Sequence, residues 1–311
     1  MLALICSGQG HQHADMFRLT RSQSAAEPVF AMAARVLGAD PRDWLASTDL
    51  DGMRRNRAAQ ILCVTTALAT HRVIRDVVPQ RLLVLGYSVG QLAAWSIAGI
   101  LQSDAALSLT ARRAELMDQL GDERDRMAVV QGLARQSVET LAHRLGVELA
   151  IVNPGAVCIV AGPADALEGF RDAALAAGAR HFSWLPIFVA SHTSRFAPAV
   201  PLLRAAIEIA RPVAPRRGIT LLDGLNGTLP RTLEEHVDTL SRQIAATIEW
   251  PQCLEAAREH GATAFLELGP GRALADMLTR VFPDAPIRSA EDFAGADGIV
   301  QWVNEVVSPR R

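Results

Sequence analysis

The sequence has no lysine, and this absence excludes two kinds of chemistry. All 31 residues of the lysine and arginine class are arginine. A Schiff base on a lysine amine and a serine–lysine catalytic pair are therefore impossible in this chain. The 33 acidic residues nearly balance the arginines and leave a formal net charge of -2. Because this charge is so small, we expect neither nucleic acid nor a membrane among the partners.

Cysteine is scarce and long apolar runs are missing. The four cysteines are far apart, without metal-ligand spacing and too few for a disulfide scaffold; they are Cys6, Cys63, Cys158 and Cys253. No apolar run reaches the roughly 18 residues of a membrane span. Residues 1–6 are apolar without a basic region before them, so we predict a buried strand there, not a signal peptide. We expect a cytoplasmic protein with reduced thiols and no bound metal or cofactor.

The most informative stretch is the pentapeptide Gly-Tyr-Ser-Val-Gly at residues 86–90. Residues 81–85 before it are apolar and strand-like, and residues 91–98 after it are rich in helix formers. Strand, sharp turn and helix form the context in which a Gly-x-Ser-x-Gly pattern becomes a nucleophile elbow. We therefore predict that Ser88 is a nucleophile. The alternative is a glycine-rich loop whose serine only caps the following helix.

Strand-like and helical segments alternate along the chain, which predicts an α/β fold with a parallel sheet. We predict strands at residues 2–7, 81–85, 218–222 and 265–268, and helices at residues 57–76, 103–120 and 233–243. The middle has the order strand, helix, strand, strand, helix, strand, which is that of a ferredoxin-like βαββαβ unit. We place this small domain at residues 125–193, inserted into a larger domain of residues 1–124 and 194–311, with a cleft between them. Residues 308–311 are expected to be disordered.

A nucleophilic serine needs a base, and the chain offers eight histidines. Four of them lie in or near predicted helices, where surface or structural roles are expected: His71, His143, His236 and His260. His11 and His13 follow a glycine turn and could line a site, although a metal pair is not favoured. His192 follows the apolar residues 185–190 at the point where the small domain rejoins the larger one. That position favours His192 as the general base, with a structural role as the alternative.

Two further segments could contribute to the same cleft. Arg113 shares a predicted helix face with Leu109, Leu116 and Met117. An arginine on an apolar face needs an anion, so it is either a clamp for a substrate carboxylate or part of a structural ion pair. The tripeptide Gly-Gln-Gly at residues 8–10 closes the first strand and could offer amides, but it lacks the third glycine of a dinucleotide fingerprint.

Taken together and in this order, these motifs resemble the malonyl-CoA:acyl carrier protein transacylase family. The resemblance rests on residues 7–12, 56–60, 86–91, 113–117, 189–192, 243–250 and 267–271. It implies an α/β-hydrolase-like large domain with a ferredoxin-like insert. It also implies that Ser88 is the nucleophile of a Ser-His dyad and His192 its base, that Arg113 binds the malonyl carboxylate, that the amides of Gln9 and Val89 form the oxyanion hole, and that the backbone carbonyl of Gln243 orients the imidazole.

The elbow departs from the family pattern at Tyr87, Val89 and Gln91, where histidine, leucine and glutamate are usual. A Gly-Tyr-Ser-Val-Gly elbow is similar to the epsilon subunit of malonate decarboxylase. This resemblance implies that malonyl-CoA is the substrate and that the acceptor is the thiol of that enzyme's carrier protein. A housekeeping transacylase of fatty-acid synthesis or a free-standing polyketide acyltransferase would use the same residues. An esterase or thioesterase fits the elbow but not Arg113, and a non-catalytic subunit that docks a carrier is a further alternative.

Overall fold

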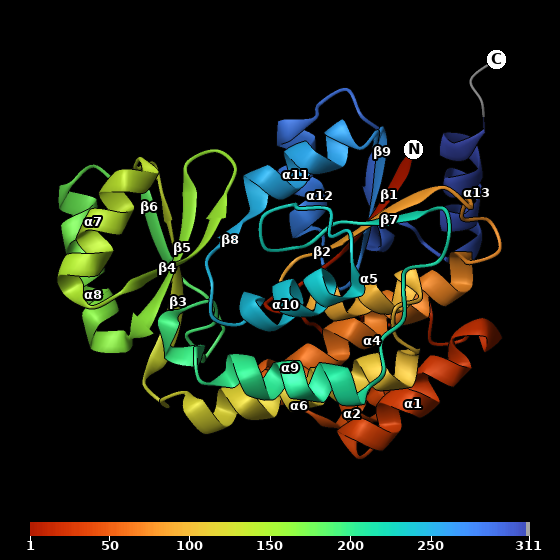
Figure 1. Ribbon diagram of the computed structural model, residues 1–311, viewed down its shortest axis with the longest axis horizontal. Coiled ribbons are helices and arrows are strands. Elements are labelled where there is room, and N and C mark those ends of the chain that lie inside the picture. Colours follow the sequence, from red (N-terminus) through yellow and green to blue (C-terminus); the bar gives the residue numbers. More distant parts are fainter. Residues whose placement is uncertain (309–311) are drawn as a thin grey trace.

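Two five-stranded β-sheets organise residues 1–308, which are the residues that the computed structural model describes. The larger sheet has the strand order β10-β9-β1-β2-β7, and all its neighbours are parallel. The smaller sheet has the order β6-β3-β5-β4-β8 and lies to one side of the larger sheet (Figure 1). The predicted mixed α/β fold with a parallel sheet is confirmed. The disorder expected at residues 309–311 lies outside the described residues.

The strands of the larger sheet are short apolar runs. They are β1 (Leu2–Cys6), β2 (Leu82–Gly86), β7 (Ile219–Leu221), β9 (Ala264–Leu268) and β10 (Ile287–Ser289). Every residue of β1, β2 and β9 is buried, because helices cover both faces of this sheet. Continuous apolar runs predicted four of these strands, each within two residues of its observed bounds. The four are β1, β2, β7 and β9.

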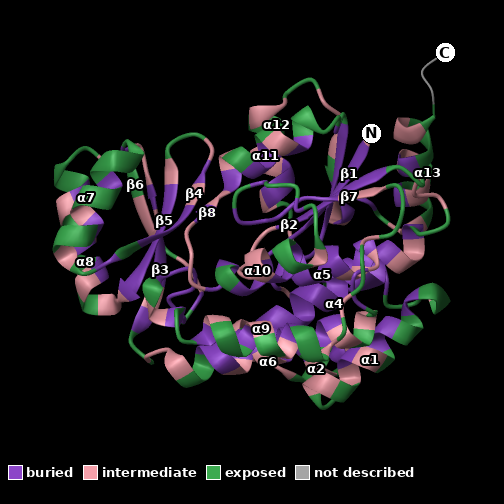
Figure 2. Cartoon of the chain, in the orientation of Figure 1, coloured by how far each residue is buried: buried purple, intermediate pink, exposed green. Residues whose placement is uncertain are grey.

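Eleven helices belong to the larger unit within the described residues. They are α1 (Glu27–Leu37), α2 (Pro41–Ser47), α3 (Leu50–Arg54), α4 (Asn56–Ile74), α5 (Gly90–Ala98), α6 (Ser103–Leu120), α9 (Ala199–Ile209), α10 (Leu233–Gln243), α11 (Trp250–Glu259), α12 (Ala273–Val281) and α13 (Ala296–Val307). Helix α4 packs against α1, α5 and α6 and is buried along most of its length (Figure 2). Its polar residues are therefore forced to find partners inside the protein.

The smaller unit follows the predicted element order. It consists of β3 (Asp125–Gln131), α7 (Arg135–Leu145), β4 (Glu148–Asn153), β5 (Val157–Pro163), α8 (Ala164–Ala176) and β6 (His181–Trp184). Strands β6, β3, β5 and β4 pair antiparallel, and α7 and α8 cover the outer face of the sheet (Figure 1). The likeness of the two units to α/β-hydrolase and ferredoxin-like domains, and their boundaries, remain predictions.

A fifth strand of the small sheet comes from the larger unit. Strand β8 (Ile248–Glu249) lies between α10 and α11 and pairs parallel with β4. Two residues are too few for a strand pattern, so the sequence did not predict β8. This strand ties the two units together beside the cleft. Within residues 1–308, every helix is too short or too polar to cross a membrane.

Candidate active site

Ser88 occupies a strained turn between the carboxyl end of β2 and the start of α5. Its φ angle is +53°, in the left-handed region that non-glycine residues rarely adopt. The turn fits only because the flanking residues lack side chains. A Cβ on Gly90 would lie 2.2 Å from the carbonyl oxygen of Cys6, and one on Gly86 would lie 2.2 Å from the Gln91 nitrogen. The elbow is thus packed directly against β1, and its serine is presented at the carboxyl edge of the sheet.

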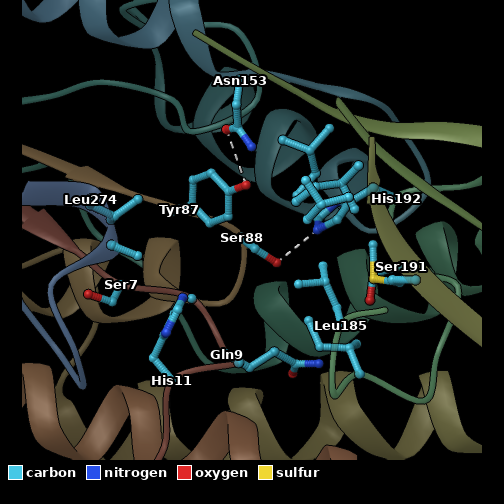
Figure 3. Close-up of a pocket in the computed structure, with 18 of the residues that line it drawn as sticks. Ser7, Gln9, His11, Tyr87, Ser88, Asn153, Leu185, Ser191, His192 and Leu274 are labelled. Carbon is cyan, nitrogen blue, oxygen red and sulfur yellow. Dashed lines mark hydrogen bonds between the residues drawn. The ribbon is translucent and has the colours of Figure 1, made fainter. Parts of the chain in front are cut away.

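His192 lies within hydrogen-bond distance of this serine. Its Nε2 is 2.8 Å from the Ser88 Oγ (Figure 3). Its Nδ1 is 2.7 Å from the backbone oxygen of Gln243. A carbonyl oxygen can only accept, so Nδ1 carries the proton and Nε2 accepts from the serine hydroxyl. The backbone amide of His192 also donates to Ile244 at 3.0 Å. The histidine is therefore fixed in one tautomer and one position by the end of α10.

Arg113 projects from α6 toward the same serine. The residue is only 3% exposed, and no carboxylate within residues 1–308 pairs with its guanidinium. Its Nη1 donates to Gln60 Oε1 at 2.6 Å, and its Nη2 lies 3.4 Å from the Ser88 Oγ. Burial lowers the pKa of Arg113 to about 10, so the group stays charged at neutral pH. A buried cation without a counter-ion is suited to an anion, and here it lies beside the serine hydroxyl.

A relay of side-chain amides orients Gln60. Its Nε2 donates to Asn56 Oδ1 at 2.7 Å, and Asn56 Nδ2 donates to Asp118 Oδ1 at 2.8 Å. Because the amide nitrogen of Gln60 is taken, its oxygen must face Arg113. The sequence interpretation gave Asn56 and Gln60 no role beyond the resemblance. The signal was nevertheless present, since two amides four residues apart share one face of an apolar helix.

The charge of Arg113 reaches His192. Burial, and second the nearby Arg113 guanidinium, lower the pKa of His192 to about 3, while the hydrogen bond with Gln243 opposes this shift. The imidazole is therefore neutral throughout the physiological range. A neutral imidazole that already accepts from the serine hydroxyl can take its proton.

Two backbone amides near Ser88 have no partner within residues 1–308. They belong to Gln9, in the loop after β1, and to Val89, which precedes α5. The loop lies against the elbow, because a Cβ on Gly8 would be 3.0 Å from the Tyr87 carbonyl oxygen. Free amides in this position can hold a negative oxygen that develops next to Ser88.

The site opens into a cavity of about 250 Å³ between the two units. Ser88, His192 and Gln9 line one side of it (Figure 3). Apolar side chains line the rest, and they include Met127, Val129, Ile151 and Ile159 from the small sheet and Leu274 and Met277 from α12. The cavity lies in the cleft that the sequence predicted between the domains.

The unusual elbow residues have structural partners. The Tyr87 hydroxyl donates to Asn153 Oδ1 at 3.3 Å (Figure 3). The Tyr87 ring packs edge-to-face on Trp250 with the centroids 4.9 Å apart. Tyr87 thus links the elbow to β4 of the smaller unit. Gln91 accepts from the Gly86 amide at 2.8 Å and donates to the Leu222 carbonyl at 2.8 Å. An ionised glutamate could not make the second bond, so glutamine suits this buried position.

The remaining histidines and cysteines are not gathered into a metal site. His11 lines the cavity, whereas His13 pairs with Glu291 at 2.7 Å. His143 and His260 are exposed, as expected for surface positions. All four cysteines are buried and free. Among residues 1–308, no three His, Cys, Asp or Glu side chains are grouped so that they could hold a metal ion.

A serine and a neutral histidine at the end of a parallel strand define a nucleophilic serine site. Comparison with known proteins gives the family. The sequence model of the acyl transferase domain family matches residues 3–296, and the chain belongs to the acyl transferase domain family. It is 29% identical over 305 residues to the malonyl CoA-acyl carrier protein transacylase of Mycobacterium tuberculosis H37Rv, covering 96% of this chain and 98% of that protein. The Escherichia coli K12 protein of the same name is 26% identical over 287 residues, covering 90% and 92%.

Solved structures share the fold over nearly the whole chain. The acyl-carrier-protein S-malonyltransferase of Burkholderia pseudomallei 1710b has a TM-score of 0.88 and 25% identity, with 96% of this chain and 99% of that chain covered. The malonyl CoA-acyl carrier protein transacylase of Coxiella burnetii has a TM-score of 0.90 at 20% identity, with 99% and 98% covered. A type II polyketide malonyl-transacylase in complex with its acyl-carrier protein has a TM-score of 0.89 at 24% identity, with 96% and 99% covered.

The low pKa of His192 predicts an unusual pH dependence for the reactivity of Ser88. Labelling by a fluorophosphonate requires neutral His192, so its rate should stay level between about pH 5 and pH 8 and fall only in stronger acid. In Arg113→Ala, the loss of the positive charge should raise the pKa of His192 and move this fall to higher pH. Arg112→Ala is the matched control and should leave the profile unchanged. A wild-type rate that falls near pH 6.5 would contradict the assigned environment of His192.

Proposed function

We propose that this chain transfers a malonyl group from malonyl-CoA to the thiol of an acyl carrier protein, through a malonyl ester on Ser88. Malonyl-CoA:acyl carrier protein S-malonyltransferase is the enzyme activity assigned. The observation that carries the proposal is Arg113, a buried and unpaired guanidinium 3.4 Å from the reacting oxygen. Malonyl differs from acetyl by one carboxylate, which such a group recognises in bidentate fashion. The names of the relatives in the preceding comparison agree with this substrate.

In the first half-reaction, the Ser88 Oγ attacks the thioester carbonyl of malonyl-CoA. The hydroxyl proton passes to His192 Nε2 along the 2.8 Å hydrogen bond. The amides of Gln9 and Val89 hold the oxyanion of the tetrahedral intermediate. When that intermediate collapses, the carbon–sulfur bond breaks and the coenzyme A sulfur receives the proton from His192. The malonyl ester remains on Ser88 with its carboxylate on Arg113.

In the second half-reaction, the carrier thiol occupies the position that coenzyme A has left. His192 takes the thiol proton, and the sulfur attacks the ester carbonyl of malonyl-Ser88. The new thioester forms as the serine oxygen leaves and recovers its proton from His192. Water would hydrolyse the ester if it had the same access as the thiol. The apolar walls from the small sheet and α12 disfavour water in the cavity.

The geometry disfavours the alternatives that differ in kind. A thioesterase activates water, and this reaction does not require a buried arginine that can bind an acyl carboxylate. A subunit that only docks a carrier has no need of a strained serine in hydrogen-bond contact with a fixed histidine. Strain of this kind costs stability and is commonly found where a side chain must be aimed at a substrate. A docking subunit predicts no adduct from malonyl-CoA, and a serine thioesterase predicts an ester that water removes and that therefore does not accumulate.

Incubation with malonyl-CoA should therefore add one malonyl group to the intact protein. Mass spectrometry of the whole chain detects the adduct, and peptide mapping should place it on Ser88. Ser88→Ala should carry none, because within residues 1–308 Ser88 has the hydroxyl that is hydrogen-bonded to His192 Nε2. An adduct that persists in Ser88→Ala would disprove this assignment.

The role of His192 as the base can be tested in the same assay. His192→Ala removes the proton acceptor and should slow acylation by about 10²–10⁴-fold, which is the usual contribution of general-base catalysis. The adduct should still form slowly on Ser88, because the nucleophile and Arg113 remain. An acylation rate in His192→Ala that equals the wild-type rate would move the role of the base elsewhere.

Arg113, and not its neighbour Arg112, should determine the preference for malonyl over acetyl. A hydrogen bond to a charged group contributes about 1.5–3 kcal/mol, so Arg113→Ala should lose roughly 10- to 150-fold of that preference. Arg112 is the matched control, because it points outward and lies 3.7 Å from Glu115. The measurement is kcat/KM for malonyl-CoA and for acetyl-CoA in each variant. The same loss in Arg112→Ala would show that the carboxylate binds on the other side of α6.

For the acceptor, we propose the carrier protein of malonate decarboxylase, on the resemblance of the Gly-Tyr-Ser-Val-Gly elbow. The ordinary carrier of fatty-acid or polyketide synthesis is the alternative that the relatives' names favour. Both end in a thiol, so the choice must be made at the cavity mouth. Arg171 and Arg195 are two arginines around the small domain that could attract an acidic carrier, but they already pair with Asp172 and with the buried Asp125.

A neighbouring groove offers a better surface for that choice. It shares Leu185 and Pro186 with the active-site cavity. The exposed aromatic rings of Trp184 and Phe188 line it, and the Arg126 guanidinium lies 4.9 Å from the centre of the Phe188 ring. An acidic carrier that binds there would have its arm next to the cavity mouth.

Direct competition between the two carriers at equal concentration tests the choice. Malonyl-enzyme should transfer to the malonate decarboxylase carrier in preference, and Arg126→Gln should reduce transfer more at low salt than at high salt. Arg144→Gln, an exposed arginine on α7, serves as the control of equal charge. Preference for the ordinary carrier would overturn the malonate decarboxylase assignment and leave the malonyl chemistry intact.

A further inference from the structure

A cluster of arginines lies at the end of the large sheet opposite to the elbow. Strand β2 runs from Leu82 to Gly86, and the elbow follows its carboxyl end. The residues just before the parallel strands β2 and β7 include Arg81, Arg216 and Arg217. One strand of five residues, at about 3.3 Å each, therefore separates this edge from the elbow. The cluster cannot take part in the chemistry of Ser88.

Two cavities open at this edge, with volumes of about 660 and 480 Å³. Both are lined by His71, Arg75 and Arg216. Arg81 and Arg217 complete the basic lining of the larger cavity, and Arg72 that of the smaller one. No acidic side chain lines either cavity. These five arginines are concentrated in one place although the whole chain carries a formal net charge of -2.

The guanidinium groups have almost no internal counter-ions. Within residues 1–308, their one ion pair joins Arg75 Nε to Asp76 at 3.6 Å, and the Asp76 side chain is 93% exposed. Arg216 is nevertheless held in place, because its Nη2 donates to the Ile97 carbonyl and its stem packs against Gly99. Part of the cluster is thus held in place, and most of its positive charges lack a negative partner.

His71 is a second, independent observation. It is only 8% exposed, it lines both cavities, and its ring forms no hydrogen bond within residues 1–308. Burial and then the charges of Arg216, Arg72 and Arg75 lower its pKa to about 3, so the ring is neutral and keeps one N–H to donate. Because the ring lines both cavities, an acceptor bound in either of them can take this N–H.

Helix α6 adds a third contribution. Its N-cap residue Gln102 makes no side-chain hydrogen bond to the helix, and Gln102 and Ser103 both line the smaller cavity. The amino end of an 18-residue helix with free amides favours an anion. Asp104 in the first turn accepts from the amide of Ala105 and keeps its negative charge, so this single carboxylate partly opposes an anion at the helix end. The arginines, the N–H of His71 and the amino end of α6 all favour negative charge at this edge of the sheet.

We propose that the amino edge of the sheet is a binding site for a small anion that carries a diphosphate group. The arginine fork fits phosphate oxygens in bidentate fashion. Two cavities that meet at shared residues suit two linked phosphates better than one. The concave shape, with the buried His71 as part of its wall, favours a small ligand over a flat macromolecular surface. This site is separate from the proposed malonyl transfer and stands or falls independently of it.

Calorimetric titration of the full chain tests the site, with inorganic pyrophosphate as the probe and ionic strength held constant by sodium chloride. Saturable binding of one pyrophosphate per chain is expected. Arg75→Gln and Arg217→Gln should each weaken it about 10-fold or more, because each removes a charge-assisted hydrogen bond. The matched control is Arg144→Gln in α7, which should bind as the wild type does. A parallel titration with ADP shows whether a nucleotide or the inorganic ion is preferred.

Two further measurements locate the bound anion. In NMR spectra, pyrophosphate should shift the imidazole signals of His71 and leave those of the exposed His143 and His260 in place. Binding should also survive in Arg113→Ala, because Arg113 lines neither of the two cavities at this edge. The proposal is overturned if the wild type shows no saturable binding, if Arg75→Gln binds with unchanged affinity, or if Arg113→Ala abolishes binding. The malonyl adduct on Ser88 can form or fail to form under any of these outcomes.

Discussion

The buried guanidinium of Arg113 is the constraint on which the rest of the site depends. A charge in the protein interior is costly unless it is paired and hydrogen-bonded. Here Arg113 donates one hydrogen bond to Gln60, whose orientation is fixed through Asn56 by Asp118 of α6. The other terminal nitrogen of the guanidinium, Nη2, faces the Ser88 hydroxyl. The fold therefore holds the Arg113 cation without a counter-ion, and a substrate carboxylate would complete the ion pair.

The Arg113 charge also acts on His192, the proposed base. Burial, and second the Arg113 guanidinium, hold the pKa of His192 far below its ordinary value while no carboxylate is present. A malonyl carboxylate on Arg113 would offset that charge and make the imidazole a stronger proton acceptor. In the proposed reaction, the substrate therefore strengthens the base that activates the nucleophile. An acetyl group provides no such charge, so selectivity arises in the proton transfer as well as in binding.

The sequence predicted what is encoded locally. The apolar strands, the elbow and the helix face of Arg113 can each be recognised within about ten residues, because period and turn chemistry are local properties. The relay from Asp118 to Gln60 joins two helices, the Tyr87–Asn153 bond joins two sheets, and β8 completes a sheet begun a hundred residues earlier. No local pattern specifies such pairings. They follow from how α4, α6 and the small sheet pack, which the sequence does not state.

The parallel sheet has two chemically different edges, and this chain places unpaired positive charge at both. At the carboxyl edge a single arginine is buried beside a nucleophile, so its anion must enter a narrow cavity and meet Ser88. At the amino edge several arginines surround His71, and the lining hydroxyls of Ser96 and Ser103 pair with each other and not with a histidine, so the proposed role of this edge is binding alone. Charge alone therefore does not define a catalytic site. The difference lies in the strained elbow, which supplies a reactive oxygen at one edge only.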